Sequence, residues 1–275
     1  MDIAGYAYIV GGGSGIGKET AIAFAKEGAA GVAIADINLA AVEEAAKEAK
    51  AAATNPDFTE LTLQVDVAQE DSVDAGTKKV VEVFGRIDYC LISAGIGIPK
   101  AMATTEVETE FFKRMMDINV TGSFLVTRSV GQAMKSQTPT PCTSVKPERA
   151  ITRGTIVHMG STASYLAGPG RCAYVVSKHA VLGLSRVAAI DLVPHGVRVN
   201  CLCPGWVDTP LIQATKSSTS GLDDMVKKLV PMGRLGMTEE TADAILYLCS
   251  PRSSYVNGCA LVMDGGTTVI VRSGI

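Results

Sequence analysis

Short apolar segments alternate with longer helical segments along almost the whole chain, and this alternation constrains the fold more than any other feature. The apolar segments are nearly continuous in Val, Ile, Leu and Ala, as expected for strands buried on both faces of a sheet. Strands and helices in alternation predict parallel βαβ units with right-handed crossovers, and so a doubly wound α/β sheet. The predicted strands cover residues 6–10, 31–35, 61–65, 87–93, 155–159, 197–202 and 260–262, and the predicted helices cover residues 15–27, 39–53, 70–84, 107–135, 173–193 and 238–248.

The length of 275 residues fits one large α/β domain over residues 1–275, and two segments interrupt its alternation. Residues 136–153 carry three prolines and join a helix to the start of a strand, so we expect a surface insertion on the edge of the sheet away from ligands. Residues 206–236 follow a strand at its carboxyl end and mix apolar residues with a polar tip at 216–221. We interpret 206–236 as a mobile lid over an apolar substrate, with a small amphipathic helix that only covers the core as the alternative.

Composition argues against several classes of function. A hydrophobic content of 47% with 19% charged residues is typical of a soluble globular core. The net charge of −3 and the few aromatic residues provide neither the basic surface nor the stacking platform of a nucleic-acid-binding protein. No apolar run reaches the ~20 residues that span a bilayer, and no signal peptide is evident. Seven scattered cysteines and three histidines indicate free thiols in the cytoplasm, without a disulfide framework or a metal site.

A glycine-rich turn lies between the first predicted strand and the first predicted helix, and it includes Gly11, Ser14, Gly15, Ile16 and Gly17. Glycines let the backbone approach a pyrophosphate, and the N-terminus of the helix offers free N–H groups to that anion. Asp36 ends the second strand, where a carboxylate accepts the ribose hydroxyls of an adenosine and repels a 2′-phosphate. This pattern favours NAD over NADP, and a solvated aspartate without this role is the alternative. Asp66 and Val67 end the third strand, and Ala94 and Gly95 follow the fourth, where small residues leave room for the cofactor.

Ser161, Tyr174 and Lys178 have the spacing of a proton-transfer site. A tyrosine and a lysine four residues apart on a helix lie on one face, one turn apart. A positive charge near a phenol favours the phenolate, and a serine beside them can hydrogen-bond the same substrate oxygen. These groups could take a proton from an alcohol while a cofactor takes its hydride. Tyr-x-x-x-Lys alone also occurs by chance, but the serine, the glycine-rich turn and Asn119 together make chance a poor explanation.

Taken together, these motifs closely resemble the short-chain dehydrogenase/reductase family in its common NAD-dependent form, along nearly the whole chain. The resemblance implies a seven-stranded parallel Rossmann sheet with helices on both faces, in a cytoplasmic homodimer or homotetramer. It adds a nicotinamide-binding turn at Pro204 and Gly205, with Val207 and Thr209 as contacts to the carboxamide and the pyrophosphate.

The resemblance also implies a role for each of four catalytic residues. Tyr174 would be the acid/base, and Lys178 would hold the nicotinamide ribose and assist the tyrosine. Ser161 would position the substrate oxygen, and Asn119 would hold a water in a proton relay. All four residues are present in this chain.

The chain departs from the family pattern in two places. Val10 stands where the family usually has a threonine before the first glycine, and Ile92 and Ser93 stand where it usually has two asparagines. In the family those polar side chains tie the central strands together. Because an unpaired buried partner is costly while the loss of both partners can be nearly neutral, the two changes can compensate each other.

The sequence therefore predicts an oxidoreductase that transfers a hydride between NAD(H) and a secondary alcohol or ketone. The residues expected around the substrate are mostly apolar and favour a hydrophobic or polycyclic compound. Two alternatives are a non-redox enzyme (a dehydratase, isomerase or cyclase) that reuses the fold with bound nucleotide, and a nucleotide-sensing protein without turnover. The intact catalytic positions argue against both. The expected wall consists of Ile96, Ile98, Ala163, Tyr165, Leu166, Trp206, Leu211 and Met225.

Overall fold

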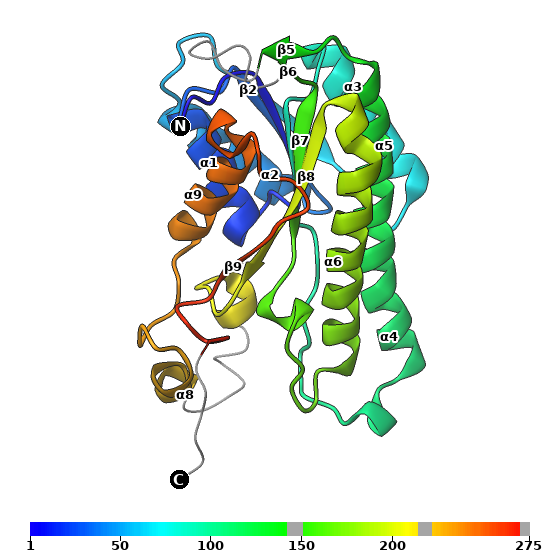
Figure 1. Cartoon of the computed structure of the whole chain (residues 1–275), viewed down its shortest axis with the longest axis vertical. Helices are drawn as coiled ribbons and strands as arrows, with labels where there is room; N and C mark the ends of the chain where they lie inside the picture. Colours follow the sequence, from blue (N-terminus) through cyan, green and yellow to red (C-terminus); the bar gives the residue numbers. More distant parts are fainter. Residues whose placement is uncertain (142–150, 214–221, 270–275) are drawn as a thin grey trace.

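Seven parallel strands form one sheet in the order β3-β2-β1-β4-β7-β8-β9 (Figure 1). The computed structural model describes residues 1–141, 151–213 and 222–269. The strand order reverses between β1 and β4, as in a doubly wound Rossmann sheet, so the predicted fold class is confirmed. The strands are β1 (Tyr6–Val10), β2 (Gly31–Asp36), β3 (Thr59–Gln64), β4 (Tyr89–Ile92), β7 (Gly154–Met159), β8 (Val197–Pro204) and β9 (Ala260–Met263).

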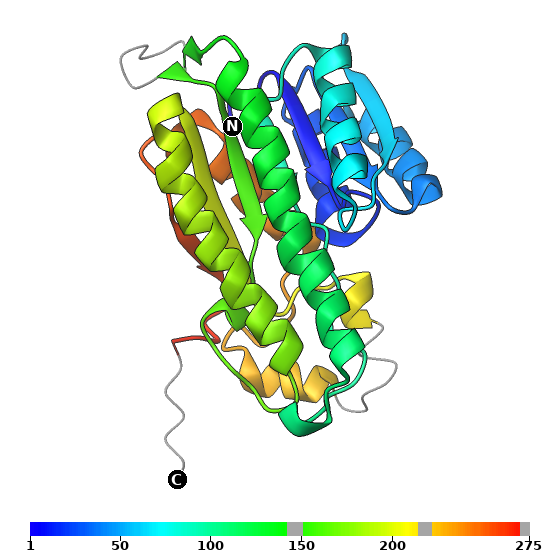
Figure 2. The ribbon, with the colours of Figure 1, turned by 90° about the vertical axis from the view of Figure 1, so that its right-hand side faces the viewer.

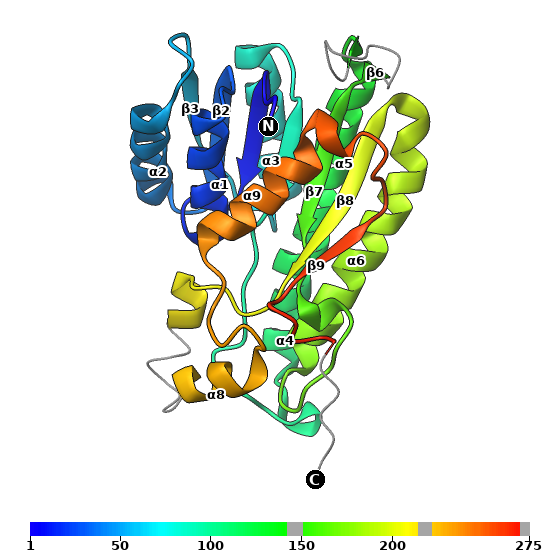
Figure 3. The same ribbon diagram turned by 60° about the vertical axis from the view of Figure 1, so that its left-hand side comes forward.

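Helices cover both faces of the sheet (Figures 2 and 3). One face is covered by α1 (Gly15–Lys26), α2 (Leu39–Ala52) and α9 (Thr238–Cys249), and the other by α3 (Glu70–Phe84), α5 (Gly122–Ser136) and α6 (Cys172–Leu192). Successive strand residues point to opposite faces, so Ile9 packs in the core under α1 and Tyr8 in the core under α3. Burial on both faces explains why the inner strands are mostly apolar, whereas the edge strand β3 has the sequence TELTLQ and is partly exposed.

The prediction of one uninterrupted helix over 107–135 is wrong. A 3₁₀ turn (Thr104–Glu106) comes first, then α4 (Thr109–Met116), and a five-residue π turn (Asp117–Thr121) separates α4 from α5. A π turn widens the helix locally without changing its apolar composition, so the helical period does not reveal it. The turn contains Asn119, one of the predicted catalytic residues.

Strand β4 begins at Tyr89, two residues later than predicted, because the Gln137 side chain takes the place of a neighbouring strand at Ile87. Its Oε1 accepts the N–H of Ile87 at 3.1 Å, and its Nε2 donates to the carbonyl of Ile87 at 2.8 Å. The same Nε2 donates to the carbonyl of Arg153. The Arg153 side chain donates back to the carbonyl of Gln137 at 2.9 Å. This reciprocal contact closes the base of the segment 136–153.

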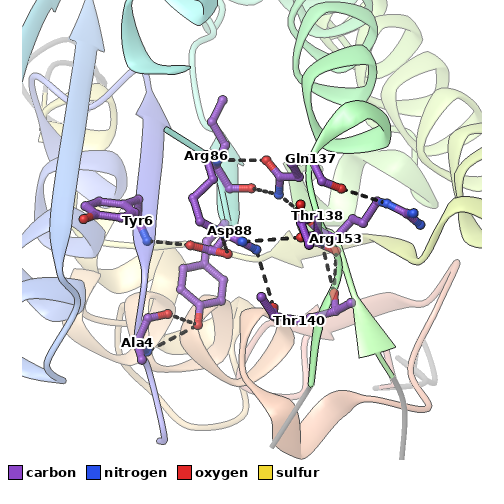
Figure 4. A network of polar contacts seen from close by, with 12 residues as sticks. Ala4, Tyr6, Arg86, Asp88, Gln137, Thr138, Thr140 and Arg153 are labelled. Atoms are coloured by element: carbon purple, nitrogen blue, oxygen red, sulfur yellow. Dashed lines mark hydrogen bonds and ion pairs between the residues drawn. The ribbon is translucent and has the colours of Figure 1, made fainter. Parts of the chain in front are cut away.

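Within that segment, β5 (Thr140–Pro141) and β6 (Ile151–Thr152) pair as a small antiparallel sheet, and residues 142–150 lie outside the described residues. Arg86 and Asp88 attach the small β5–β6 sheet to the amino ends of the strands in the seven-stranded sheet (Figure 4). The Arg86 Nε lies 2.7 Å from Asp88 Oδ1, and Asp88 Oδ2 accepts the N–H of Tyr6 at 2.9 Å. The pair β5 and β6 thus lies at the end of the main sheet opposite α8 (Leu222–Leu229) (Figure 1).

The segment 206–236 contains α8 (Leu222–Leu229), and its predicted polar tip at 216–221 lies outside the described residues. The buried Val226 and Val230 form a small core together with Trp206, Ile212, Met225 and Leu235. The two ends of the segment are joined, since the N–H of Gly236 donates to the carbonyl of Trp206 at 2.8 Å. The described part is therefore a packed helical cover at the carboxyl end of β8.

Two further observations bear on the composition. The six cysteines in the described parts of the chain are all free, and four of them are buried. Cys142 lies outside these parts. Across residues 1–141, 151–213 and 222–269, no helix is both long enough and apolar enough to cross a membrane.

Candidate active site

The glycine-rich turn joins β1 to α1 and packs against the loop that follows β4. Gly11 has a φ of +83°, and a Cβ on it would lie 2.3 Å from the amide nitrogen of Ala94. A Cβ on Gly17 would lie 2.0 Å from the carbonyl oxygen of Gly11. Only glycine fits at these two positions. Ser14 precedes the first residue of α1, and its side chain does not cap the helix. The first N–H groups of α1 therefore have no side-chain cap to displace when an anion binds.

Asp36 lies at the end of β2, beside this turn. Its Oδ2 accepts the N–H of Gly13 at 3.1 Å, and its Oδ1 accepts the N–H of Asn38 at 3.2 Å. The nearest cation along α1 is engaged elsewhere, because Lys18 Nζ lies 2.7 Å from Glu48 Oε1. The structure thus places a carboxylate beside the glycine-rich turn, and the Lys18 ammonium is paired with Glu48.

Asp66 and Val67 follow β3, whose last residue pairs with Asp36. Asp66 Oδ1 accepts the N–H of Ala68 at 3.0 Å, which fixes the carboxylate in a local turn. Val67 is buried, and a Cβ on Gly122 would lie 2.9 Å from its Cβ. Val67 therefore packs closely against the start of α5, just after the π turn.

The turn after β8 reaches the glycine-rich turn, as predicted. Thr209 Cγ2 lies 3.6 Å from the position that a Cβ on Gly15 would take. Pro204 is the last residue of β8, and Gly205 packs so closely on Asp264 that a Cβ there would lie 2.8 Å from the Asp264 Cβ. Val207 is buried and pairs with Gly236. Residues separated by almost two hundred positions thus meet around one prospective phosphate site.

Tyr174 and Lys178 lie one turn apart on α6, at the carboxyl end of β7. Lys178 is buried, and its Nζ donates to the carbonyl of Met159 at 2.8 Å. The same Nζ lies 5.7 Å from the centroid of the Tyr174 ring. Ser161 begins the turn after β7, and its Oγ accepts the N–H of Ala163 at 3.2 Å. The last residue of β7 therefore fixes the ammonium group beside the tyrosine.

Asn119 fixes the loop after β4 by two hydrogen bonds to its main chain. Its Oδ1 accepts the N–H of Ile96 at 2.8 Å, and its Nδ2 donates to the Ile96 carbonyl at 3.0 Å. A Cβ on Gly95 would lie 3.2 Å from Asn119 Oδ1 and 4.0 Å from Lys178 Nζ. The side chain of Asn119 thus holds the loop against the lysine, and the wide π turn brings it there.

Ser177 belongs to this group of residues, and the sequence reasoning missed it. It is fully buried, accepts a hydrogen bond from Asn119 Nδ2 at 3.1 Å, and donates to the carbonyl of Tyr174 at 2.8 Å. It therefore connects the π turn to the first turns of α6. The available signal was a small polar residue next to Lys178 on a helix whose buried side is mostly apolar.

The two departures from the family pattern face each other across neighbouring strands. Val10 on β1 pairs in register with Ile92 on β4, and both are buried. The N–H groups of Ser93 and Ala94 donate to the carbonyl of Val10 at 2.8 and 3.0 Å. An apolar pair thus replaces the polar connection, while main-chain hydrogen bonds continue the link between the strands.

A buried histidine lies below the site on β7. Thr127 donates its hydroxyl proton to the carbonyl of Ser123 at 2.6 Å, so His158 Nε2, 2.7 Å from Thr127 Oγ1, acts as the donor to that hydroxyl. The other ring nitrogen of His158 is buried and has no partner among the described residues. Burial, reinforced by the charge of Lys178, lowers the pKa of His158 to about 4. The imidazole is therefore neutral at physiological pH.

The predicted apolar wall comes from the loops after β4, β7 and β8. Leu211 packs against the first of these loops, since a Cβ on Gly97 would lie 2.8 Å from Leu211 Cδ1. Tyr165 and Leu166 are exposed on the second. Trp206 on the third stacks with Arg171, whose guanidinium carbon lies 5.2 Å from the ring centroid. Arg171 was not among the predicted site residues.

Comparison with known proteins identifies the family of this chain. A family profile described as enoyl-(acyl carrier protein) reductase matches residues 11–268. Short-chain dehydrogenase fogB of Aspergillus ruber is 49% identical over 273 residues, which cover 99% of this chain and 100% of the relative. The chain belongs to the short-chain dehydrogenase/reductase family.

Two further similarities extend this result. A 2,5-dichloro-2,5-cyclohexadiene-1,4-diol dehydrogenase of Sphingobium indicum is 40% identical, over 98% of this chain and 99% of the relative. The crystal structure of a short-chain dehydrogenase/reductase from Mycobacterium marinum superposes with a TM-score of 0.85 at 31% identity, over 98% of each chain. This short-chain dehydrogenase is therefore an oxidoreductase that uses a nicotinamide nucleotide.

Proposed function

We propose that this short-chain dehydrogenase transfers a hydride between NAD(H) and a secondary alcohol or ketone with a mostly apolar body. The observation that carries the proposal is the juxtaposition of Tyr174, Lys178 and Ser161 at the carboxyl end of β7. The glycine-rich turn lies at the same end of the sheet, which is where open α/β sheets bind ligands.

The residues divide the reaction into a proton transfer and a hydride transfer. Bound NAD supplies the hydride acceptor, and its reduced form supplies the hydride in the reverse direction. In alcohol oxidation, the Tyr174 phenolate takes the hydroxyl proton while Ser161 donates a hydrogen bond to the same oxygen. Lys178, fixed by the Met159 carbonyl, stabilises the negative charge on the tyrosine and would hold the nicotinamide ribose.

Asp36 supports NAD as the preferred nucleotide. Its carboxylate already accepts main-chain N–H groups and presents negative charge beside the glycine-rich turn. A ribose diol can donate to this carboxylate, whereas a 2′-phosphate would meet like charge. Lys18 cannot relieve that repulsion without giving up its ion pair with Glu48.

The remaining parts of the chain support this chemistry in different ways. Asn119 and Ser177 would act as positioning residues, with Asn119 close to a proton relay, and residues 206–236 would form a lid over the substrate. Residues 136–153 would be a surface insertion of a single domain over residues 1–275. The free thiols are consistent with a cytoplasmic protein. We propose that it assembles as a homodimer or homotetramer.

The proposal is tested by following absorbance of the reduced nicotinamide with a panel of cyclic and aromatic secondary alcohols and ketones. The name of the relative from Sphingobium indicum places cyclic diols in this panel. Oxidation or reduction of at least one compound, with NAD(H) preferred, is expected. Tight binding of NAD without any hydride transfer across the panel would instead favour a dehydratase, isomerase or cyclase.

A further inference from the structure

We propose that Arg171 makes this enzyme select substrates that carry an acidic oxygen, a carboxylate or an ionised phenol, next to an apolar body. This inference rests on the proposed function, because it assumes that the substrate lies beside Tyr174. Arg171 is the N-cap residue of α6, three residues before Tyr174, and it is half-buried. A residue at this place is at the edge of the catalytic group and still open to solvent on one side.

Three loops around the catalytic residues meet at Arg171. Its side chain stacks on Trp206, in the turn after β8, at 5.2 Å from the ring centroid. Its backbone forms a bridge with Met102, in the loop after β4, and the N–H of Met102 donates to the carbonyl of Gly170 at 3.1 Å. Arg171 itself ends the loop after β7. A substrate held by these loops therefore lies within reach of the guanidinium group.

The guanidinium carbon of Arg171 lies over the indole ring of Trp206. The indole side chain has no oxygen or nitrogen acceptor, so this cation–π contact does not satisfy the N–H donors of the arginine. Across the described parts of the chain, no carboxylate pairs with Arg171 and no acceptor receives a hydrogen bond from its side chain. These planar donors suit the two oxygens of a carboxylate or the oxygen of a phenolate.

Other arginines of this chain show what a structural role requires. Arg86 pairs with Asp88 at 2.7 Å. The Arg198 guanidinium is buried under α9, where it donates to the carbonyls of Val256 and Leu248 at 3.0 Å each. Among the residues that the structure describes, Arg171 has no such acceptors, yet Trp206 holds it in a defined place. A cation that is positioned but not neutralised is suited to bind an anionic ligand.

The surroundings of Arg171 define the rest of the ligand. Tyr165 and Leu166 lie on the loop after β7 and Leu211 on the segment after β8, and all three are 43 to 48% exposed. These side chains can gain contacts when an apolar ligand covers them. The predicted substrate is therefore amphipathic, with a hydrophobic body and one acidic oxygen group away from the reacting carbon.

The test measures ligand binding to the enzyme loaded with NADH, by the change in NADH fluorescence. Benzoate and benzamide have almost the same size and differ in charge, and 4-cyanophenolate and 4-methoxybenzonitrile form a second pair that distinguishes a phenolate from a carboxylate. We expect at least one acidic member to bind ~10-fold more tightly than its neutral partner, as is usual for a charge-assisted hydrogen bond. Arg171→Met should abolish this preference and leave the affinity for the neutral members within a few-fold.

Arg252→Met is the matched control. Arg252 is exposed in the turn after α9, where it pairs with Asp2 at the end of the sheet opposite the site, so its loss removes the same charge without touching the site. It should retain the preference for the acidic ligand. An equal loss of affinity for acidic and neutral ligands in Arg171→Met would overturn the proposal, since Arg171 would then only join the loops. Equal affinities in the wild-type enzyme would overturn it as well.

The binding assay also separates this proposal from the proposed function. NADH binding is measured in the same titration, and it precedes any step that involves Arg171. If NADH fails to bind, or if no alcohol in the panel is oxidised, the failure lies with the proposed function. If NADH binds and a neutral alcohol is oxidised while neither acidic ligand is preferred, only the role of Arg171 is wrong.

Discussion

Two single side chains lead to predictions about nucleotide preference and about the response to acid. Asp36 presents a carboxylate beside the glycine-rich turn, and His158 is a titratable group buried near Lys178. Both lie at the carboxyl ends of parallel strands, Asp36 on β2 and His158 on β7, so their positions are set by the sheet. Each yields a prediction that involves no other part of the fold.

The first residue-scale prediction concerns Asp36. Wild-type enzyme should bind NAD at least ~10-fold more tightly than NADP, because a 2′-phosphate meets the carboxylate without a cationic partner. Asp36→Ala should weaken NAD binding by about 10- to 100-fold, because charge-assisted hydrogen bonds are lost. The difference between the NAD and NADP affinities should therefore become smaller. Asp36→Asn keeps the shape of the side chain but removes its charge, so it should strengthen NADP binding more than Asp36→Ala does. Fluorescence titration with both reduced nucleotides measures this, and equal wild-type affinities would refute it.

The second residue-scale prediction concerns His158 and acid stability. Burial lowers the pKa of His158 from 6.5 to about 4, so between these values the unfolded chain binds a proton that the folded chain does not. Stability from this residue is therefore complete above pH 6.5 and falls as the pH drops towards 4, by about 3 kcal/mol in total. His158→Gln removes the titratable ring, so the free energy of unfolding should depend less on pH between 4 and 6.5. Urea denaturation at a series of pH values measures it, and an unchanged slope in the variant would exclude His158 as the cause.

At the scale of elements, the two ends of the sheet have different tasks. The carboxyl ends of the strands carry the glycine-rich turn, the π turn and the loops around Tyr174, and the amino ends carry the β5–β6 pair on its polar network (Figures 1 and 4). Gln137 is central to that network because it satisfies the N–H and the carbonyl of Ile87. Changes at the amino end should therefore affect stability more than chemistry.

The element-scale prediction compares the tip and the base of the insertion. Replacing residues 142–150 by a short glycine-serine turn should leave nucleotide affinity and turnover within a few-fold. Gln137→Ala should cost about 1–3 kcal/mol of stability, because buried main-chain groups lose their partners, with turnover of the folded enzyme largely retained. Thermal unfolding and steady-state kinetics on the same samples test both variants. A large loss of turnover in the folded tip variant would mean that the insertion reaches an active site, such as that of a second subunit.

At the scale of the whole molecule, an apolar surface remains on the outer side of α5 and α6, which lie side by side in Figure 2. Phe124 on α5 and Val176, Val187 and Ile190 on α6 are exposed, the last by 71%. Such a surface on two long helices favours contact with another copy of the chain. Light scattering at micromolar concentration should therefore give two or four times the chain mass of 28.6 kDa. Ile190→Glu should shift the protein towards smaller species, and a wild-type monomer would contradict the assembly.

Much of the molecule follows from local sequence. Seven apolar segments predicted the seven strands, and the glycines of the first turn predicted its position, because Gly11 and Gly17 meet steric demands that no other residue satisfies. The π turn at Asn119 could not be predicted, since one wider turn leaves the apolar pattern on either side unchanged. The Arg171–Trp206 stack and the Ser177 hydrogen bonds depend on the meeting of distant loops, which no local pattern contains.

Tyr174 is proposed to carry the proton in an alcohol oxidation that depends on NAD. Tyr174→Phe removes the phenolic oxygen and almost no volume, so NADH should bind with near wild-type affinity. Oxidation of the best secondary alcohol should fall by about two to four orders of magnitude, the range expected for a general base. Lys178→Met should instead weaken both binding and turnover, since its ammonium serves both. The decisive measurement is the single-turnover rate of NADH formation by Tyr174→Phe saturated with NAD, and a rate close to that of the wild type would contradict the mechanism.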